Sequence, residues 1–190
     1  MSFDPAGLGV VIYPEAVLRR KATPVAAVTD EVRAVAARMI ELMFEENGIG
    51  LAAPQVGLSW RLFVAHVPED EDRRLSDDPP TCTAEPRVYI NPELVEPGGE
   101  LEPYEEGCLS LPEIRGQVFR PPLITMRATG LDGGTFTLRA AGLLARCWQH
   151  EVDHLNGVLI IDRMTQMSRL KNRSAVRALE KSADQDVRRA

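Results

Sequence analysis

Two histidines flank a glutamate in the segment His-Glu-Val-Asp-His at residues 150–154. Residues four apart lie on one face of a helix, about 6 Å apart along its axis, so His150 and His154 could bind one metal ion. Glu151 would lie at the edge of that face, beside a water bound to the ion. Because unpaired imidazoles are costly on an otherwise apolar helix face, the spacing predicts a metal site with Glu151 as general base.

A catalytic divalent ion usually has three protein ligands and one open position for water. Cys147 shares the helix face, but the helix would rise about 10.5 Å from residue 147 to residue 154, too far for bonds of roughly 2.0–2.3 Å to meet. We therefore expect Cys147 to be a core or pocket residue. His66, inside an apolar strand pattern, is expected to be a hydrogen-bonded structural residue, and Cys82 lies in an acidic loop that suits a ligand poorly. Cys108 differs, because its segment EEGCLSLP has a glycine that permits close approach and a proline that stiffens the exit.

Two histidines and a thiolate around a divalent ion would make a hydrolytic site. The ion lowers the pKa of a bound water, which becomes a nucleophile near neutral pH. Glu151 would take the water's proton as a carbonyl is attacked and would pass it to the departing amine. The developing oxyanion needs hydrogen-bond donors besides the metal.

Hydrophobic spacing predicts the elements that would position these residues. One helix should begin at Thr29-Asp30 and end at Asn47-Gly48, a second should run over about residues 140–155, and a polar helix should begin at Ser168. Short strands are expected at residues 61–67, 87–91, 117–120, 123–128, 135–139 and 158–161. The acidic, proline-bearing residues 68–86 should form an exposed loop outside the core. The predicted fold is α+β, with small antiparallel β-sheets around a central metal-binding α-helix and a helix at each end.

Composition limits the class of protein. The chain has 190 residues, 44% of them hydrophobic, which fits one catalytic domain over residues 1–190 with a C-terminal polar helix or tail at 168–190. The chain has neither a long uncharged apolar run nor the pattern of a secretory signal, so we expect no membrane contact. Three widely spaced cysteines do not suggest a disulfide framework. A reducing, cytoplasmic location and a monomer are expected.

Charge is unevenly distributed along the chain. The net charge of −6 argues against a general nucleic-acid binder. Residues 163–190 nevertheless carry eight Lys and Arg against three Asp and Glu. A solvated helix face is the simpler interpretation, and contact with an acidic partner such as ribosomal RNA is the alternative.

Three segments together resemble the peptide deformylase family: GIGLAAPQVG at residues 48–57, EGCLS at 106–110 and QHEVDH at 149–154. Their order and spacing fit as well, and the resemblance extends from the first helix to about Asp162. It implies a metal-dependent hydrolase that removes the formyl group from the N-terminal formyl-methionine of nascent proteins and releases formate. Ferrous iron would be the metal, with zinc, nickel or cobalt able to take its place. The extended peptide would pair with an exposed strand edge.

The resemblance also assigns roles to single residues. It implies that Cys108, His150 and His154 hold the metal and that Glu151 is the catalytic acid–base group. Gln55 would donate to the oxyanion from its side-chain amide, beside the backbone N–H of Leu109. The positions that would contact substrate are Gly50 along the peptide backbone and, around the methionine pocket, Ile49, Leu109, Cys147 and Arg115.

Two features depart from the family pattern. Arg146 stands where an aliphatic residue is frequent near the methionine pocket, so either its stem packs while its head reaches water, or the side-chain preference is altered. Residues 68–86 are longer than the corresponding loop of compact members.

Two rival functions fit less well. A zinc peptidase also uses His-Glu-x-x-His, but one branch needs a histidine six residues after His154, where the chain has Ile160, and no strong downstream helix offers a glutamate ligand. A binding module with a structural zinc would need four ligands, commonly with a Cys-x-x-Cys pair, which the chain lacks.

Overall fold

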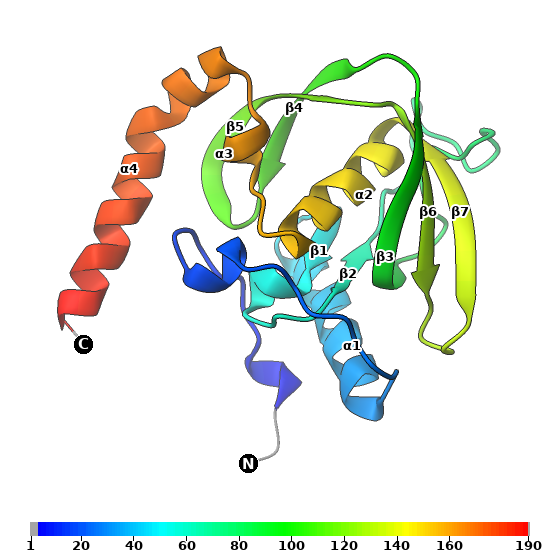
Figure 1. The fold of residues 1–190 in the computed structure, drawn as a ribbon, viewed down its shortest axis with the longest axis horizontal. Coiled ribbons are helices and arrows are strands. Elements are labelled where there is room, and N and C mark those ends of the chain that lie inside the picture. Colours follow the sequence, from blue (N-terminus) through cyan, green and yellow to red (C-terminus); the bar gives the residue numbers. More distant parts are fainter. Residues whose placement is uncertain (1–3, 190) are drawn as a thin grey trace.

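The computed structural model describes residues 4–189 and confirms the predicted α+β class (Figure 1). A five-stranded antiparallel sheet has the order β1-β2-β3-β6-β7, and β4 and β5 form a separate hairpin. The strands are β1 (Gly50–Ala52), β2 (Leu62–Ala65), β3 (Arg87–Gly98), β4 (Glu102–Cys108), β5 (Leu111–Arg120), β6 (Leu123–Thr129) and β7 (Thr135–Ala141). The α-helices are α1 (Asp30–Glu45), α2 (Gly142–Leu155), α3 (Ile160–Arg163) and α4 (Gln166–Arg189). Residues 1–3 and 190, which the predicted domain includes, lie outside the described residues.

Helix α1 forms where the sequence predicts it. Thr29 caps its first turn, with its hydroxyl oxygen accepting from the backbone N–H of Val32 at 3.3 Å. Its buried face consists of the residues with helical apolar spacing: Val32, Val35, Ala36, Met39, Leu42 and Met43. Burial of this face against the sheet, rather than helix propensity alone, stabilises α1.

The five-stranded sheet packs between α1 and α2, because alternate strand residues point to opposite faces. The face toward α1 includes Leu51, Leu62, Val64, Val88 and Ile90. The face toward α2 includes Ala52, Phe63, Ala65, Tyr89 and Met126, which join Leu144 and Trp148 of the helix. Helix α2 therefore lies in the middle of the molecule, with the sheet on one side and the β4–β5 hairpin on the other (Figure 1).

Several boundaries differ from the prediction. Helix α2 begins at Gly142, two residues late, because β7 continues to Ala141 and Gly142 turns the chain with a φ of 54°. The strand predicted at residues 158–161 is wrong, since Ile160–Arg163 forms α3. The Asp162 carboxylate caps this helix by accepting from the backbone N–H of Leu159 at 2.8 Å. Strands β1 and β4 were not predicted, and β3 and β5 are longer than expected.

The predicted exposed loop is correct in most of residues 68–86, which contain neither helix nor strand. Its end is an exception, because Cys82 is buried and packs in the core beside α2. The expectation that the whole segment lies outside the core is therefore wrong at that residue.

Helix α4 extends to one side of the molecule, where the sequence predicts the C-terminal helix (Figure 1). Its partly buried Ala175, Val176 and Leu179 pack against a cluster that includes residues of β5 and α3. The hydroxyl of Tyr13 donates to the Glu180 carboxylate at 2.9 Å and ties the helix to the N-terminal segment. None of the helices described between residues 4 and 189 is long and apolar enough to cross a membrane.

Candidate metal and active site

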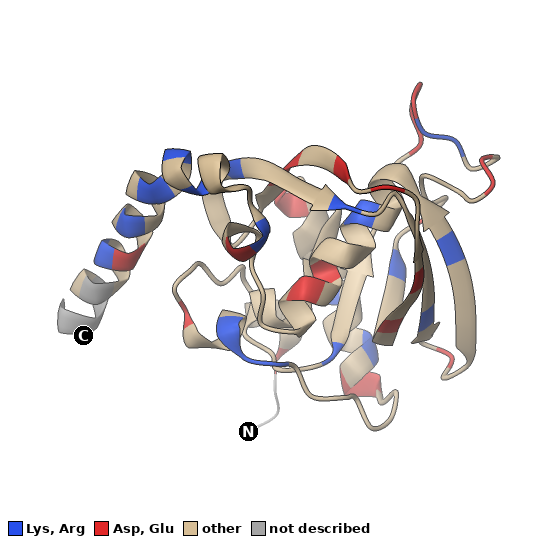
Figure 2. Ribbon diagram, turned by 45° about the horizontal axis from the view of Figure 1, so that its top comes forward, with Lys and Arg blue, Asp and Glu red and all other residues tan. Residues whose placement is uncertain are grey.

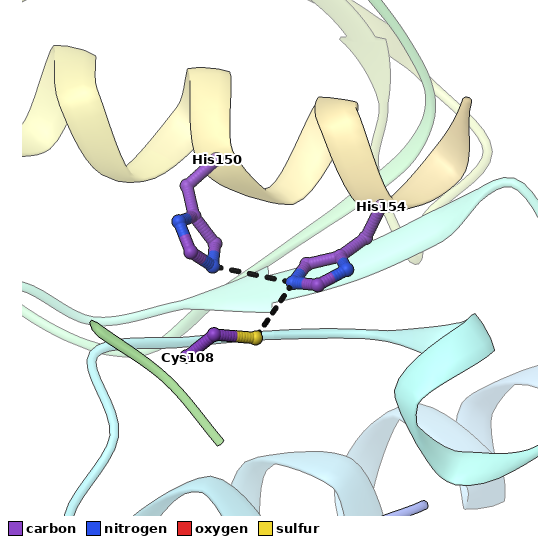
Figure 3. Close-up of side chains that lie close together, drawn as sticks. All are labelled: Cys108, His150 and His154. Carbon is purple, nitrogen blue, oxygen red and sulfur yellow. Dashed lines mark hydrogen bonds between the residues drawn. The ribbon is translucent and has the colours of Figure 1, made fainter. Parts of the chain in front are cut away.

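The side chains of Cys108, His150 and His154 meet between the hairpin and helix α2 (Figure 3). The two histidines project from successive turns of α2 toward Cys108, which ends β4. The Nε2 atom of His154 lies 3.2 Å from Nε2 of His150 and 3.3 Å from Sγ of Cys108. All three donor atoms lie within 4.8 Å of one another.

These distances fit a bound metal ion. Ligand atoms bonded at roughly 2.0–2.3 Å in a tetrahedral arrangement are about 3.3–3.8 Å apart, and the two short distances of 3.2 and 3.3 Å are close to that range. Burial opposes a charge on His150, but hydrogen bonds with Cys108 and Glu106 raise the pKa of its imidazole to about 10. The negative neighbours that favour a proton there equally favour a metal cation between the three donor atoms.

Glu106 orients the first of the two histidines. Its Oε2 atom accepts from Nδ1 of His150 at 3.1 Å, which leaves Nε2 of the ring for the ion. Burial alone would raise the pKa of the Glu106 carboxyl, but hydrogen bonds from His150 and Arg120 hold it well below its usual range. Glu106 is thus an ionised acceptor inside the protein, a role that its sequence position two residues before Cys108 does not reveal.

A network of ion pairs holds the Glu106 carboxylate in place. Arg120 of β5 donates to both oxygens of Glu106, from Nε at 2.7 Å and from NH2 at 2.9 Å. Its third nitrogen donates to Asp153 of α2 at 2.8 Å, and Arg163 donates to the other oxygen of Asp153 at 2.7 Å. Every buried charge in this network has a partner of opposite sign, as a buried ion needs.

Glu151 lies beside the metal-binding group with one oxygen available. It is 3% exposed and lines a cavity of about 500 Å³, and its Oε2 atom has no hydrogen-bond partner among the described residues. Burial raises the pKa of its carboxyl to about 7, against the lowering effects of His150 and Arg120. A carboxyl with this pKa and a free oxygen can exchange a proton with a molecule in the cavity near neutral pH.

Gly50 brings strand β1 into contact with this carboxylate. A Cβ atom at residue 50 would collide with the Glu151 carboxylate and would lie 2.9 Å from Sγ of Cys147. The neighbouring residue Ile49 accepts from the Cys147 thiol through its carbonyl oxygen at 3.4 Å. The absence of a side chain at Gly50 therefore lets β1 approach the site closely.

Gln55 presents its amide to the same site from the short helix Ala53–Val56. Its Oε1 accepts from the backbone N–H of Ala52 at 2.8 Å, which orients the side chain so that Nε2 points toward Cys108, 3.6 Å from Sγ. The same nitrogen lies 3.4 Å from the hydroxyl of Ser110. Leu109 lies between Cys108 and Ser110 and lines the cavity together with Gln55.

A cavity of about 500 Å³ opens beside these residues. Ile49, Leu109, Cys147 and Arg115, which the sequence places around a substrate pocket, all line it. Arg115 is exposed at its rim, whereas Cys147 is only 4% exposed. Lining residues that the sequence did not single out include Tyr104 and Leu143. Tyr104 stands in an acidic segment and Leu143 in the apolar residues 140–145, and neither pattern indicates a shared cavity.

His66 and Cys147 are placed as expected, whereas Cys82, expected in an exposed loop, is buried. His66 is hydrogen-bonded through Nδ1 to the hydroxyl of Thr83 at 2.9 Å, which confirms a structural role. Cys147 is a buried pocket residue, and Cys82 lies in the core away from the three donor atoms.

Of the two alternatives for Arg146, the one in which its head reaches water is wrong. The residue is 8% exposed, and its guanidinium donates to Glu106, to the carbonyl oxygen of Val118 and to that of Glu102. Arg146 also lines the cavity. The acceptors in the hairpin hold the guanidinium inside the protein. They are far from Arg146 in the sequence, so the sequence alone does not indicate these contacts.

Comparisons with known proteins agree over nearly the whole chain. The family model described as polypeptide deformylase matches residues 8–170. A peptide deformylase of Rhodopseudomonas palustris is 42% identical over 179 residues, which cover 94% of this chain and 96% of that protein. A peptide deformylase of Rhizorhabdus wittichii is 46% identical over 169 residues, covering 89% of this chain and 91% of that protein. The crystal structure of peptide deformylase from Ehrlichia chaffeensis is similar with a TM-score of 0.83 and 32% identity, over 95% of this chain and 98% of that one.

Proposed function

Because the chain belongs to the peptide deformylase family and is a hydrolase that removes the formyl group from nascent peptides, we propose that Cys108, His150 and His154 hold its metal and that Glu151 is its acid–base group. The observation that carries this proposal is the meeting of three donor atoms within 4.8 Å of one another, beside a buried carboxylate with a free oxygen. Residues 1–190 would form one catalytic domain, with residues 168–190 as a polar C-terminal helix or tail.

The metal would supply a Lewis acid that activates water and polarises the formyl carbonyl. The protein's contribution is to fix the three donors before the ion arrives. His150 is oriented by its hydrogen bond to Glu106, and His154 is fixed by burial one helical turn further along α2. Cys108 completes the set from β4, so the ligands come from two elements that the ion network joins.

Glu151 would move the proton during hydrolysis. Its free Oε2 would accept a proton from water as the formyl carbon is attacked, and the same carboxyl would then donate that proton to the departing amine of methionine. Burial keeps bulk water from competing for this exchange. The strand that carries Gly50 restricts the carboxylate to one side.

Gln55 and Leu109 would stabilise the negative charge that develops on the formyl oxygen. The amide nitrogen of Gln55 faces Cys108, and its orientation is fixed by the hydrogen bond from Ala52. The backbone N–H of Leu109 would donate from the neighbouring position. Loss of one such donor typically lowers kcat about 10²–10³-fold, so Gln55→Ala should do so without removing a metal ligand.

The methionine side chain would enter the cavity of about 500 Å³. Ile49, Leu109 and the buried Cys147 supply apolar walls, and Arg115 lies at the rim. Strand β1 is an edge strand, paired only with β2 in the sheet, so the extended peptide could add along Gly50. A structure with bound product that shows the peptide elsewhere would contradict this arrangement.

Formate release from formyl-Met-Ala-Ser tests the proposal directly. Protein purified anaerobically and loaded with iron or nickel should release formate, and Glu151→Ala should lower the rate by about 10²–10⁴-fold while the metal stays bound. A metal-loaded parent that cleaves internal peptide bonds instead would favour a peptidase.

Ferrous iron is the metal that we propose for the protein in the cell. Two imidazoles and one thiolate suit iron, zinc, nickel and cobalt, and the family resemblance favours iron. The thiolate would make an iron-loaded site sensitive to oxidation, which agrees with a reducing, cytoplasmic location and with the three free cysteines. Metal analysis of protein isolated anaerobically from its own cells would test the assignment.

One chain should suffice for activity, because every candidate ligand and the acid–base group come from the same chain. We therefore propose a monomer. Light scattering at the enzyme concentration used for assays would show a single 21.0 kDa species, and activity that depends on a dimer would contradict the proposal.

Helix α4 is proposed to contact the ribosome through its basic residues (Figure 2). Its partly buried Ala175, Val176 and Leu179 pack against the body of the protein, whereas its exposed side chains include the apolar Met167 and Leu170 and the basic Arg169, Lys171, Arg173, Arg177 and Lys181. This arrangement leaves the positive charge free for RNA phosphates. Changing Arg169, Lys171, Arg173 and Arg177 to Gln should weaken salt-dependent ribosome binding, and binding equal to that of the parent would refute the contact.

A further inference from the structure

Arg146 joins helix α2 to both strands of the hairpin. Its NH1 atom donates to Oε1 of Glu106 at 2.8 Å and to the carbonyl oxygen of Val118 at 3.1 Å. Its NH2 atom donates to the carbonyl oxygen of Glu102 at 2.8 Å. Glu102 and Glu106 belong to β4, whereas Val118 belongs to β5. One planar guanidinium therefore fixes two strands, which a single-point cation such as lysine does less well.

The hairpin depends on such long side chains for its connection to α2. The backbone of α2 packs mainly against the five-stranded sheet, especially β1, β2 and β7. On the side of the hairpin, Arg146 and Arg120, which reaches from β5 to Asp153 of α2, add to the contacts of His150 with Glu106 and of His154 with Cys108. The space left between helix and hairpin contains the cavity of about 500 Å³. The width of that cavity therefore depends on how these arginines hold the hairpin.

Tyr104 restrains the head of Arg146 from the other side. The guanidinium carbon lies 5.2 Å from the centroid of the Tyr104 ring, within the range of a cation–π contact. Tyr104 is half exposed and lines the cavity, whereas Arg146 is nearly buried. Arg146 lines the same cavity while these contacts fix its head.

The same contacts connect the cavity to the metal ligands. The carboxylate of Glu106 is shared, with Oε1 accepting from Arg146 and Oε2 accepting from His150. Cys108 ends the strand that Arg146 holds, and the two histidines project from the helix that carries Arg146. A shift of the hairpin would therefore change both the cavity and the separation of Cys108 from the histidines.

We propose that Arg146 is a positioning residue that holds the hairpin against α2 and thereby sets the width of the methionine pocket and the fit of Cys108 to the two histidines. This inference rests on the proposed function, since it uses the proposed pocket and ligands. An aliphatic residue at position 146 could line the pocket but would make none of the three hydrogen bonds of Arg146. This chain accordingly uses a charged anchor at that position.

The test compares Arg146→Met, which keeps an apolar stem, with Arg146→Lys, which keeps the charge. Arg127→Met is the matched control, because Arg127 is exposed on β6 and pairs only loosely with Glu93, at 3.6 Å. The first readout is the ratio of kcat/KM for formyl-Met-Ala-Ser to kcat/KM for formyl-Phe-Ala-Ser at saturating nickel. A smaller fraction of folded enzyme lowers both values equally, so a merely structural role would not change the ratio. The second readout is nickel affinity by chelator competition, which needs no activity.

In Arg146→Met, the ratio should fall about tenfold, and the KM for the formyl-Met peptide should rise more than kcat falls. Nickel affinity should fall about tenfold, as it does when an outer partner of a ligand is lost. Arg146→Lys should lie between this variant and the parent, and Arg127→Met should match the parent. A parent-like ratio and nickel affinity in Arg146→Met would overturn the inference. If that variant does not fold, a parent-like ratio in Arg146→Lys would do so. A parent that releases no formate would contradict the proposed function instead, and the nickel affinities would still decide the role of Arg146.

Discussion

His150 donates from Nδ1 to the Glu106 carboxylate at 3.1 Å, and its opposite ring nitrogen lies 3.2 Å from Nε2 of His154. The hydrogen bond to Glu106 thus determines which nitrogen of His150 is available to a metal. Such outer partners typically raise metal affinity and fix the orientation of the ring. Glu106 itself is held by Arg120 and Arg146, so the orientation of His150 depends on residues from three separate elements.

Removing the charge of Glu106 should weaken metal binding. Glu106→Gln is expected to lower nickel or zinc affinity about 10–100-fold, because the amide is a poorer acceptor for His150 and leaves two arginines without their shared carboxylate. Chelator competition measures the effect. Glu100→Gln, at an exposed turn residue, is the matched control. An unchanged affinity in Glu106→Gln would show that its hydrogen bond to His150 is dispensable.

A methyl group at Gly50 should separate catalysis from metal binding. Its Cβ would collide with the Glu151 carboxylate and would lie 2.9 Å from Sγ of Cys147. Since a displacement of about 1 Å can cost roughly 100-fold in rate, Gly50→Ala should lower kcat/KM by at least that factor while metal affinity is retained. Gly9→Ala, whose Cβ would meet no atom within 4 Å, should keep the parent's activity. Full activity in Gly50→Ala would mean that Glu151 can move without consequence.

Local sequence patterns predict the parts of the fold that local interactions stabilise. The apolar spacing of α1 corresponds to its buried residues, and the spacing of His150 and His154 places both on one face of α2. Strands β1 and β4 were missed because short or polar segments become strands through their partners: β1 pairs with β2, and β4 pairs with β5. The apolar residues 158–161 resemble a strand, but the Asp162 carboxylate favours a helical turn.

At the site too, the sequence predicts residue types and local spacing but not contacts between distant segments. Cys108 could be proposed from its segment and from the family resemblance, but its distance from the histidines depends on how the hairpin packs against α2. Sequence spacing likewise could not show that Glu106 accepts from His150 across 44 residues, or that Arg146 reaches Glu102 across the same separation. Such contacts depend on tertiary structure, whose pairings a single sequence does not determine.

The end of α2 should be sensitive to substitution at Gly157. This residue has a φ of 73°, and its backbone N–H donates to the carbonyl oxygen of His154 at 3.0 Å. A Cβ at this position would lie 2.6 Å from the carbonyl oxygen of Arg19. Gly157→Ala is therefore expected to lower the free energy of unfolding by more than the roughly 1–3 kcal/mol that backbone strain alone costs. Denaturant titration measures the change.

Gly133→Ala separates the two causes of that loss. Gly133 has a similar φ of 81°, but a Cβ there would meet no atom within 4 Å. This variant should lose only the backbone contribution, so Gly157→Ala should be the less stable of the two. Equal stabilities would mean that the contact with Arg19 relaxes without cost.

The three free cysteines should differ in their reactivity. Cys82 and Cys147 are 2% and 4% exposed, and burial raises the pKa of both thiols, so both should react slowly with iodoacetamide in the folded protein. Cys108 lines the cavity and should be the fast-reacting thiol of the metal-free protein. Added zinc should slow its alkylation at least about tenfold, because a metal-bound thiolate is withdrawn from the reagent. Peptide mapping by mass spectrometry identifies the labelled residue, and Cys108→Ser provides the blank. Alkylation of Cys108 at the same rate with and without zinc would exclude it as a metal ligand.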